Sequence, residues 1–358
     1  FALAKKDNVF GFNVYLGGKN TQIAQDANIF LYKEEVFEFF KAFIQMFNKY
    51  GLRLDRQRNR LYNLIEEIGI EKLIEYLKEF YNKKLETKGE LLLEKKNFNE
   101  FEKLKNSKYS FCYHSLFARI EASELLEIAN WAIKDDLEVR LGTDQQIYIF
   151  NLLEPKASII HYNGNRTMLA CAGSDFCPYA YWNIKEEIQS LPLEKIERNN
   201  ILVGFSGCLK GCAKHEHSDI GLVGLKSDVH GKREKTARIY LGGLYTFGEA
   251  NARKIFNAIP LYSLKEILEI IIDEYEQSGY PTFESFSKNI LNNFDTDFLS
   301  SWFLAKFKTK EKVYLKKNLN EIELFKKYFK KYSFYNIEEN NNFYNITQIL
   351  YKDLWFSK

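Results

Sequence analysis

The sequence predicts an α+β fold built from a duplicated unit with pseudo-twofold symmetry. Three observations support this prediction: a strand ending in paired glycines occurs twice, a strand–helix–strand–strand order lies mid-chain, and a predicted strand leads into a cysteine pair. With 358 residues, 46% of them hydrophobic, the chain has apolar material for two or three domains.

The duplicated motif occupies residues 15–21 (YLGGKNT) and residues 240–246 (YLGGLYT). A helical pattern of acidic and apolar residues follows each copy, over 34–50 and 264–277, and a glycine ends each pattern. Paired glycines after an apolar strand predict a tight turn or a close backbone approach. The shared downstream pattern favours duplication over a chance match.

The first half begins with a predicted strand over residues 9–16, which enters the first glycine pair. Helical apolar spacing covers residues 34–50 and 58–84, with Gly69 as a break. Residues 85–108 are rich in lysine and glutamate and predict a linker between the halves.

The middle of the chain predicts a ferredoxin-like half-domain. Ser123 is the expected N-cap of a helix over residues 124–134, and strands over 138–141 and 146–151 follow. This order suits an α+β layer.

The second half contains two further predicted strands and a tail. Residues 201–205 form a strand that delivers Cys208, and residues 238–241 enter the second glycine pair. Residues 306–331 interleave lysines with Phe, Tyr and Leu, which predicts an accessory helical tail with a loop at 340–342. The predicted division is a first repeat, a linker, a ferredoxin-like half-domain, a cysteine-bearing domain and a C-terminal tail, over residues 1–84, 85–108, 109–160, 161–292 and 293–358.

Four of the five cysteines form two pairs, Cys171 with Cys177 and Cys208 with Cys212. Four converging thiolates can hold a [4Fe-4S] cluster, which takes one cysteine per iron. Zinc sites usually have gaps of two to four residues in both pairs, so the five-residue gap favours iron and sulfur, although zinc and unrelated cysteines remain alternatives. An odd cysteine count argues against a disulfide framework, and Cys112 is expected to be a buried free thiol.

The composition excludes two classes of partner. A formal charge of +3 and the lack of a long basic run argue against nucleic-acid binding. The sequence contains no stretch of about 18 or more uncharged apolar residues, so we expect no membrane span. Reduced thiolates and a cluster lead us to expect a cytoplasmic protein.

Three segments together resemble the sirohaem nitrite/sulfite reductases. Residues 206–224 resemble the second cysteine box of that family, and residues 170–178 resemble its Cys-x5-Cys segment. Residues 139–147 (VRLGTDQQI) resemble a family strand motif, in which the positions of Arg140 and Gln145 match.

The resemblance implies a [4Fe-4S] cluster joined to sirohaem, on a duplicated nitrite/sulfite reductase fold. The implied metal ligands are Cys171, Cys177, Cys208 and Cys212, with Cys212 bridging the cluster and the haem iron. Arg140 and Gln145 are implied to lie against sirohaem, whose carboxylates suit guanidinium and amide donors. An ordinary exposed arginine is the alternative for Arg140.

The implied reaction is six-electron reduction of sulfite to sulfide or of nitrite to ammonia, with an electron donor such as ferredoxin or a flavoprotein. Pro178 after Cys177 favours sulfite, because a lysine is common there in nitrite reductases. Lys210 departs from the family's asparagine and is expected to raise the cluster potential if its ammonium points inward.

No catalytic residue is assigned. In the family, the basic residues that bind the anionic substrate come largely from the first half, and we expect them to precede Phe1, together with the partner of residues 116–155. An alternative from another class is a non-catalytic iron–sulfur redox module.

Some other residues have two interpretations each. His215 either contacts the cofactor or only packs, and the context of Asp219 favours a structural turn. The arginines after Gly51 either approach the macrocycle or form a solvated face, and Asn13 and Lys19 are weak candidates for cofactor contact. The arginines are Arg53, Arg56, Arg58 and Arg60.

Overall fold

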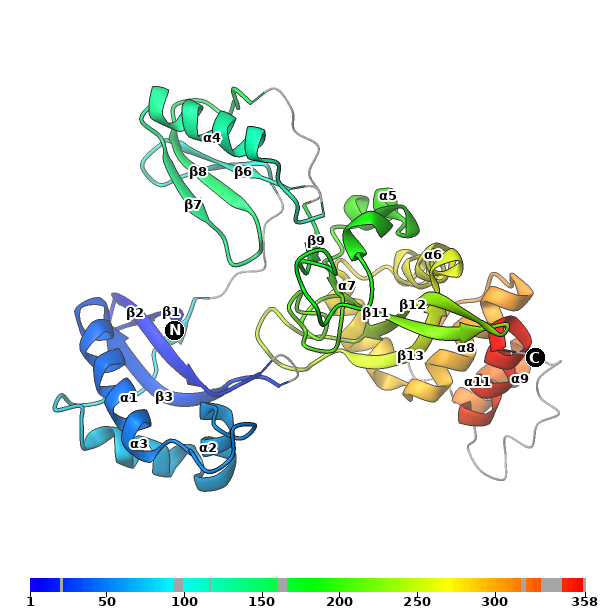
Figure 1. The fold of residues 1–358 in the computed structure, drawn as a ribbon, viewed down its shortest axis with the longest axis horizontal. Helices are drawn as coiled ribbons and strands as arrows, with labels where there is room; N and C mark the ends of the chain where they lie inside the picture. The colour runs from blue at the N-terminus through cyan, green and yellow to red at the C-terminus, as the bar shows by residue number, and fades with distance from the viewer. Residues whose placement is uncertain are drawn as a thin grey trace. The chain divides into compact units, whose positions relative to one another are not determined.

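The computed structural model describes residues 1–19, 22–92, 99–115, 117–159, 166–316, 320–329 and 343–356. The fold is α+β, as predicted, with helices and strands along the whole chain (Figure 1). The chain divides into two compact units. One unit is Phe1–Lys96 with Thr246–Glu249, and the other is Asn97–Tyr245 with Ala250–Lys358. The predicted five-part division stays a prediction.

The first unit contains a four-stranded sheet in the order β3-β2-β1-β4. The strands are β1 (Ala2–Lys6), β2 (Val9–Leu16), β3 (Gln25–Tyr32) and β4 (Glu90–Leu91). The strand predicted over 9–16 is confirmed as β2. Asp7 and Asn8 connect β1 and β2 with φ angles of 47° and 64°, a two-residue turn whose twist matches an antiparallel pair.

Helices pack their apolar faces on this sheet. They are η1 (Lys33–Glu35), α1 (Val36–Tyr50), α2 (Leu61–Ile68) and α3 (Ile70–Lys78). The core they share with the sheet includes Val14, Met46 and Leu73. The break predicted at Gly69 is confirmed, because this residue separates α2 from α3 with a φ of 81°. The two helices together are shorter than the predicted span of 58–84.

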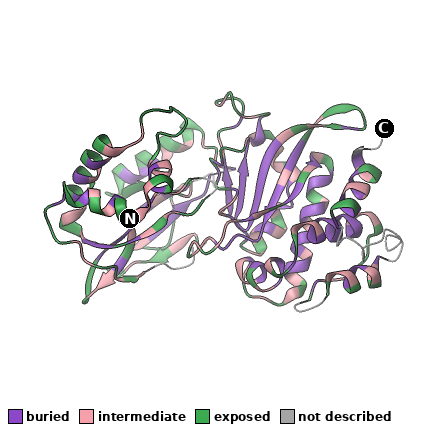
Figure 2. Cartoon of the chain, turned by 90° about the horizontal axis from the view of Figure 1, so that it is seen from below, coloured by how far each residue is buried: buried purple, intermediate pink, exposed green. Residues whose placement is uncertain are grey.

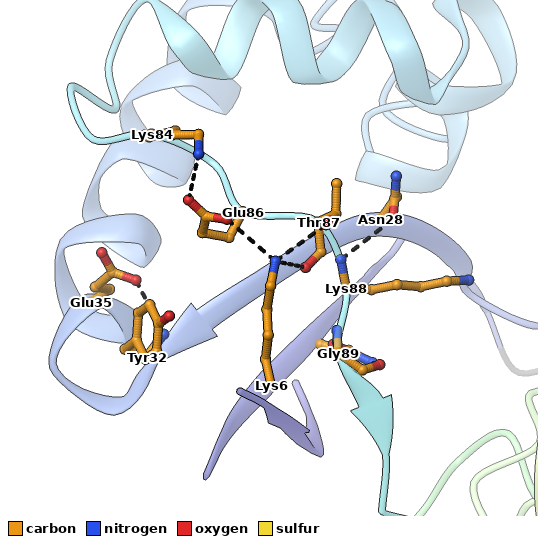
Figure 3. A network of polar contacts seen from close by, with 10 residues as sticks. Lys6, Asn28, Tyr32, Glu35, Lys84, Glu86, Thr87, Lys88 and Gly89 are labelled. Carbon is orange, nitrogen blue, oxygen red and sulfur yellow. Dashed lines mark hydrogen bonds and ion pairs between the residues drawn. The ribbon is translucent and has the colours of Figure 1, made fainter. Parts of the chain in front are cut away.

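The segment after α3 returns along the sheet and is held by polar contacts (Figure 3). Lys6 Nζ donates to Glu86 Oε2 at 3.2 Å and to the Thr87 carbonyl at 2.8 Å. The buried Asn13 amide exchanges two hydrogen bonds with the Gly89 backbone, which assigns Asn13 a structural role. The segment predicted as a linker thus carries β4 near its start.

The ferredoxin-like layer belongs to the second unit and has the predicted strand–helix–strand–strand order. Its antiparallel sheet runs β5-β6-β8-β7, with one helix between β6 and β7. The elements are β5 (Phe101–Lys103), β6 (Tyr109–Tyr113), α4 (Ala122–Lys134), β7 (Glu138–Leu141) and β8 (Ile147–Leu152). The N-cap prediction was wrong: Glu121 caps α4 in a reciprocal capping box with Glu124, so Ser123 lies inside the first turn.

The second unit also contains a five-stranded sheet in the order β13-β12-β11-β10-β9. Its strands are largely buried (Figure 2). They are β9 (Met168–Ala170), β10 (Val203–Ser206), β11 (Ile220–Val229), β12 (Lys232–Leu241) and β13 (Arg253–Pro260). The accompanying helices are η2 (Ile184–Ser190), α5 (Leu193–Arg198), α6 (Leu261–Ser278), α7 (Phe283–Asn289) and η3 (Leu291–Asn293).

The predicted duplication is visible in the order of elements. A hairpin, a third antiparallel strand and a helix follow one another as β1, β2, β3 and α1, and again as β11, β12, β13 and α6. Gly17 and Gly18 have φ angles of 74° and 75°, and Gly242 has 88°, which explains the glycines after β2 and β12.

The C-terminal tail is helical, as expected, but it is built into the core of the second unit. Its helices are α8 (Thr296–Thr309), α9 (Glu321–Tyr328), α11 (Phe343–Tyr351) and η5 (Lys352–Phe356). Trp302 and Phe303 are fully buried against α6 and β13, and Lys306 pairs with the buried Glu274 at 2.7 Å. The loop predicted at 340–342 lies outside the described residues. Across the described helices, none combines the length and hydropathy needed to cross a membrane.

Candidate metal centre

Two neighbouring parallel strands place both cysteine pairs at the same edge of the sheet. Ala170 of β9 lies opposite Phe205 of β10, so both strands end together and their following loops meet. Cys171 N–H donates to the Phe205 carbonyl at 3.1 Å, and Gly207 N–H donates to Cys171 Sγ at 3.0 Å. The first cysteine of one loop therefore contacts the backbone of the other.

Gly207 is required by this close approach. A Cβ atom at Gly207 would lie 2.8 Å from Ala180 Cβ and 3.2 Å from Cys171 Sγ. Tyr181 N–H also donates to the Gly207 carbonyl at 3.2 Å. Only glycine lets the two loops pack while leaving the Cys171 sulfur in place.

The loop that carries the second pair connects β10 to β11 without a helix. Ser206 Oγ accepts a hydrogen bond from Ala213 N–H at 3.2 Å and lies 3.0 Å from His215 Nδ1. Gly211 has a φ of 73°, and Lys214 N–H bonds its carbonyl at 2.9 Å. These bonds fold the loop back over the end of β10 and present Cys208 and Cys212 beside the first loop.

The four thiols share one neighbourhood and none forms a disulfide. Cys212 is an exposed residue, but partial burial of its thiol raises its pKa, and the charges of Cys171, Cys208 and Cys177 raise it further. Within the described ranges, no three His, Cys, Asp or Glu side chains converge closely enough for one metal ion. A [4Fe-4S] cluster does not need such convergence, because each thiolate binds a different iron. The donor set therefore fits a cluster.

The β7–β8 loop contacts the end of β9, just before Cys171, and the second cysteine loop. Gln145, at a φ of 66°, uses its side-chain amide on the Ala170 backbone, donating at 3.0 Å and accepting at 2.9 Å. Lys214 Nζ donates to the Thr143 carbonyl at 3.1 Å. The structure thus gives Gln145 a role next to Cys171 that sequence reasoning missed. Arg140 is exposed on β7, with its guanidinium paired to Glu138.

Other candidate residues lie as follows. His215 is fully buried with its ring 4.9 Å from that of Tyr240, and burial lowers its pKa to about 4, which supports the packing interpretation. Asp219 lies in a bend directly before β11, and its buried carboxylate accepts from Leu202 N–H at 2.9 Å, which agrees with the structural role expected for it.

The remaining predictions concern exposure. Lys210 Nζ lies 3.9 Å from the centre of the exposed Tyr179 ring, so its ammonium is directed to that ring. Cys112 is buried and free of disulfides, as expected. The four arginines after Gly51 are exposed, and Lys19 lies over the Tyr62 ring.

A comparison with known proteins gives the family. The family model "Nitrite and sulphite reductase 4Fe-4S domain" matches residues 1–85 and 162–285, which are the two copies of the duplicated unit. The chain is 29% identical to the chloroplastic ferredoxin–nitrite reductase of Arabidopsis thaliana, over 76% of this chain and 52% of that protein. It is 24% identical to sulfite reductase [ferredoxin] 2 of Mycolicibacterium paratuberculosis, over 65% of this chain and 47% of that protein.

Among solved structures, the NirA protein of Mycobacterium tuberculosis has the same fold, with a TM-score of 0.70 and 20% identity over 83% of this chain and 59% of that one. The chain spans about half the length of the curated relatives that it matches. It belongs to the nitrite and sulphite reductase 4Fe-4S domain family.

Proposed function

We propose that the protein is a sirohaem- and [4Fe-4S]-dependent oxidoreductase that reduces nitrite or sulfite by six electrons. The observation that supports this most is the pair of cysteine loops delivered to one sheet edge by β9 and β10, in a chain of this family. When bound, the cluster would pass on electrons from the donor, and sirohaem would supply the iron at which the oxyanion is reduced.

The chain's own residues hold and orient these groups. Cys171, Cys177, Cys208 and Cys212 would hold the cluster, and Cys212 would also contact sirohaem. Cys212 is the one exposed thiol of the four, whereas the others are half-buried, so it is the thiol with room for a large macrocycle. Arg140 can exchange its exposed ion pair for a sirohaem carboxylate at little cost, because exposed pairs contribute only about 0–1 kcal/mol.

Two observations bear on the substrate and favour different answers. Similarity is greater to the nitrite reductase of Arabidopsis thaliana than to the mycobacterial sulfite reductase. Pro178, which is a single exposed residue, favours sulfite. We place nitrite first because similarity over most of the chain outweighs one loop position. Ferredoxin is the proposed donor, and the cytoplasm is the proposed compartment.

Anaerobic purification followed by metal analysis tests the proposal. We expect about five iron atoms per chain, four in the cluster and one in sirohaem, and a haem Soret band. With reduced viologen as donor, kcat/KM for nitrite should exceed that for sulfite. A cluster without haem or turnover would support the redox-module alternative, and stoichiometric zinc without a chromophore would refute both.

A further inference from the structure

Lys185 lies at the start of η2 with its ammonium bound to two backbone carbonyls. Nζ donates to the Phe117 carbonyl at 2.9 Å and to the Ala118 carbonyl at 2.7 Å. Phe117 and Ala118 have φ angles of 48° and 53°, a left-handed conformation that is costly for side chains other than glycine. Two successive residues are thus held in an unfavourable conformation that aims their carbonyls at one cation.

The ammonium of Lys185 is partly buried. Among the described residues it forms no ion pair, and the charged side chains that act on it are Cys171 and Arg119. Burial lowers its pKa to about 8, while the Cys171 charge opposes that change. Packing places this ammonium near the first cysteine loop: the Phe117 ring packs edge-on against the Phe205 ring at 6.0 Å between centroids, and the Phe205 carbonyl accepts from Cys171 N–H at 3.1 Å. A cation removed from water needs a compensating anion, and a cluster bound at that loop would supply one.

A [4Fe-4S] cluster on four thiolates supplies such an anion. The cluster is negative in both redox states and gains one further negative charge when it accepts an electron from its donor. A nearby fixed positive charge stabilises the more negative state and so makes reduction easier. We propose that Lys185 is a positioning residue whose charge raises the reduction potential of the cluster held by Cys171. This inference rests on one part of the proposed function, the binding of a [4Fe-4S] cluster.

The expected change in the reduction potential of the cluster follows from the charge of Lys185. At an effective dielectric constant of about 20, a unit charge within about 10 Å changes an equilibrium constant by more than tenfold. Replacing Lys185 with methionine keeps the chain length and removes the charge. We therefore expect Lys185→Met to lower the equilibrium constant for one-electron reduction at least about tenfold, which corresponds to about 59 mV.

The experiment is a redox titration of the anaerobically purified protein, followed by the electron paramagnetic resonance signal of the reduced cluster. Lys185→Arg keeps the charge and should stay near the wild-type potential. Lys210→Met is the matched control, because it also removes a lysine charge beside a cysteine loop. Its ammonium is exposed over the Tyr179 ring and screened by water, so its removal should change the equilibrium constant less than about twofold.

Iron content, measured in parallel, separates the outcomes. A loaded Lys185→Met protein with an unchanged potential would overturn the inference, as would an equal shift in Lys210→Met. Loss of the cluster in both the Met and the Arg variants would also overturn it, because the carbonyl contacts and not the charge would then matter. Loss of the cluster in Lys185→Met together with its retention in Lys185→Arg would support the inference. A wild-type protein without a cluster would instead refute the proposed function.

Discussion

Gln145 offers a direct test of how the β7–β8 loop positions the cluster. Its amide bonds the N–H and the carbonyl of Ala170, the last residue of the edge strand β9, and Ala170 is only 2% exposed. The side chain thus occupies the place of a further strand. Gln145→Ala removes both hydrogen bonds and leaves two backbone groups of the residue before Cys171 without a partner.

The expected cost follows from these two bonds. Each hydrogen bond contributes about 0.5–1.5 kcal/mol net, so the closed loop should be destabilised by about 1–3 kcal/mol relative to its open state. This corresponds to a roughly 5- to 150-fold larger open population. If the cluster leaves through that open state, its release to a chelator should accelerate by the same factor, measured anaerobically as the loss of cluster absorbance.

Two variants isolate the cause. Gln145→Gly removes the same bonds but relieves the φ of 66°, so it should release the cluster more slowly than Gln145→Ala. Thr143→Ala leaves the backbone carbonyl that binds Lys214 and should behave as wild type. A folded Gln145→Ala protein that releases its cluster at the wild-type rate would refute the reasoning.

Three further predictions concern the bridge, the tail and pH. Cys212→Ser should disturb the haem and cluster spectra together, whereas Cys177→Ser should first disturb the cluster; intact spectra in Cys212→Ser would contradict the bridge. Lys306→Met leaves the buried Glu274 carboxylate without its cation and should cost about 3–5 kcal/mol in denaturant unfolding, partly restored by adding Glu274→Gln. His215 stays neutral in the fold to about pH 4, whereas its unfolded pKa is 6.5, so the unfolded state binds more protons between these values. Stability should fall by roughly 3 kcal/mol as the pH drops from 6.5 to 4, and His215→Gln should flatten that dependence.

The sequence alone determined the features that depend on local pattern. The repeated glycine motif predicted the duplication, because glycine is needed where β2 and β12 end in left-handed turns. The spacing of the cysteines, with the residues around them, indicated the cluster and the family. Strand β2 followed directly from its apolar pattern, while the N-cap at Ser123 failed because two glutamates form the capping box instead.

Only the tertiary structure decided which side chains surround the cysteines. Gln145 reaches Ala170 across 25 residues of sequence, and Lys185 reaches Phe117 across 68. No periodicity or motif encodes such distant partners, since they depend on how the ferredoxin-like layer packs beside β9. Likewise, the lysine-rich pattern predicted an accessory helical tail, yet Lys306 is buried because Glu274, on the earlier helix α6, supplies its counter-charge. The ligands could be identified in the linear pattern, whereas their supporting contacts arise only from long-range packing.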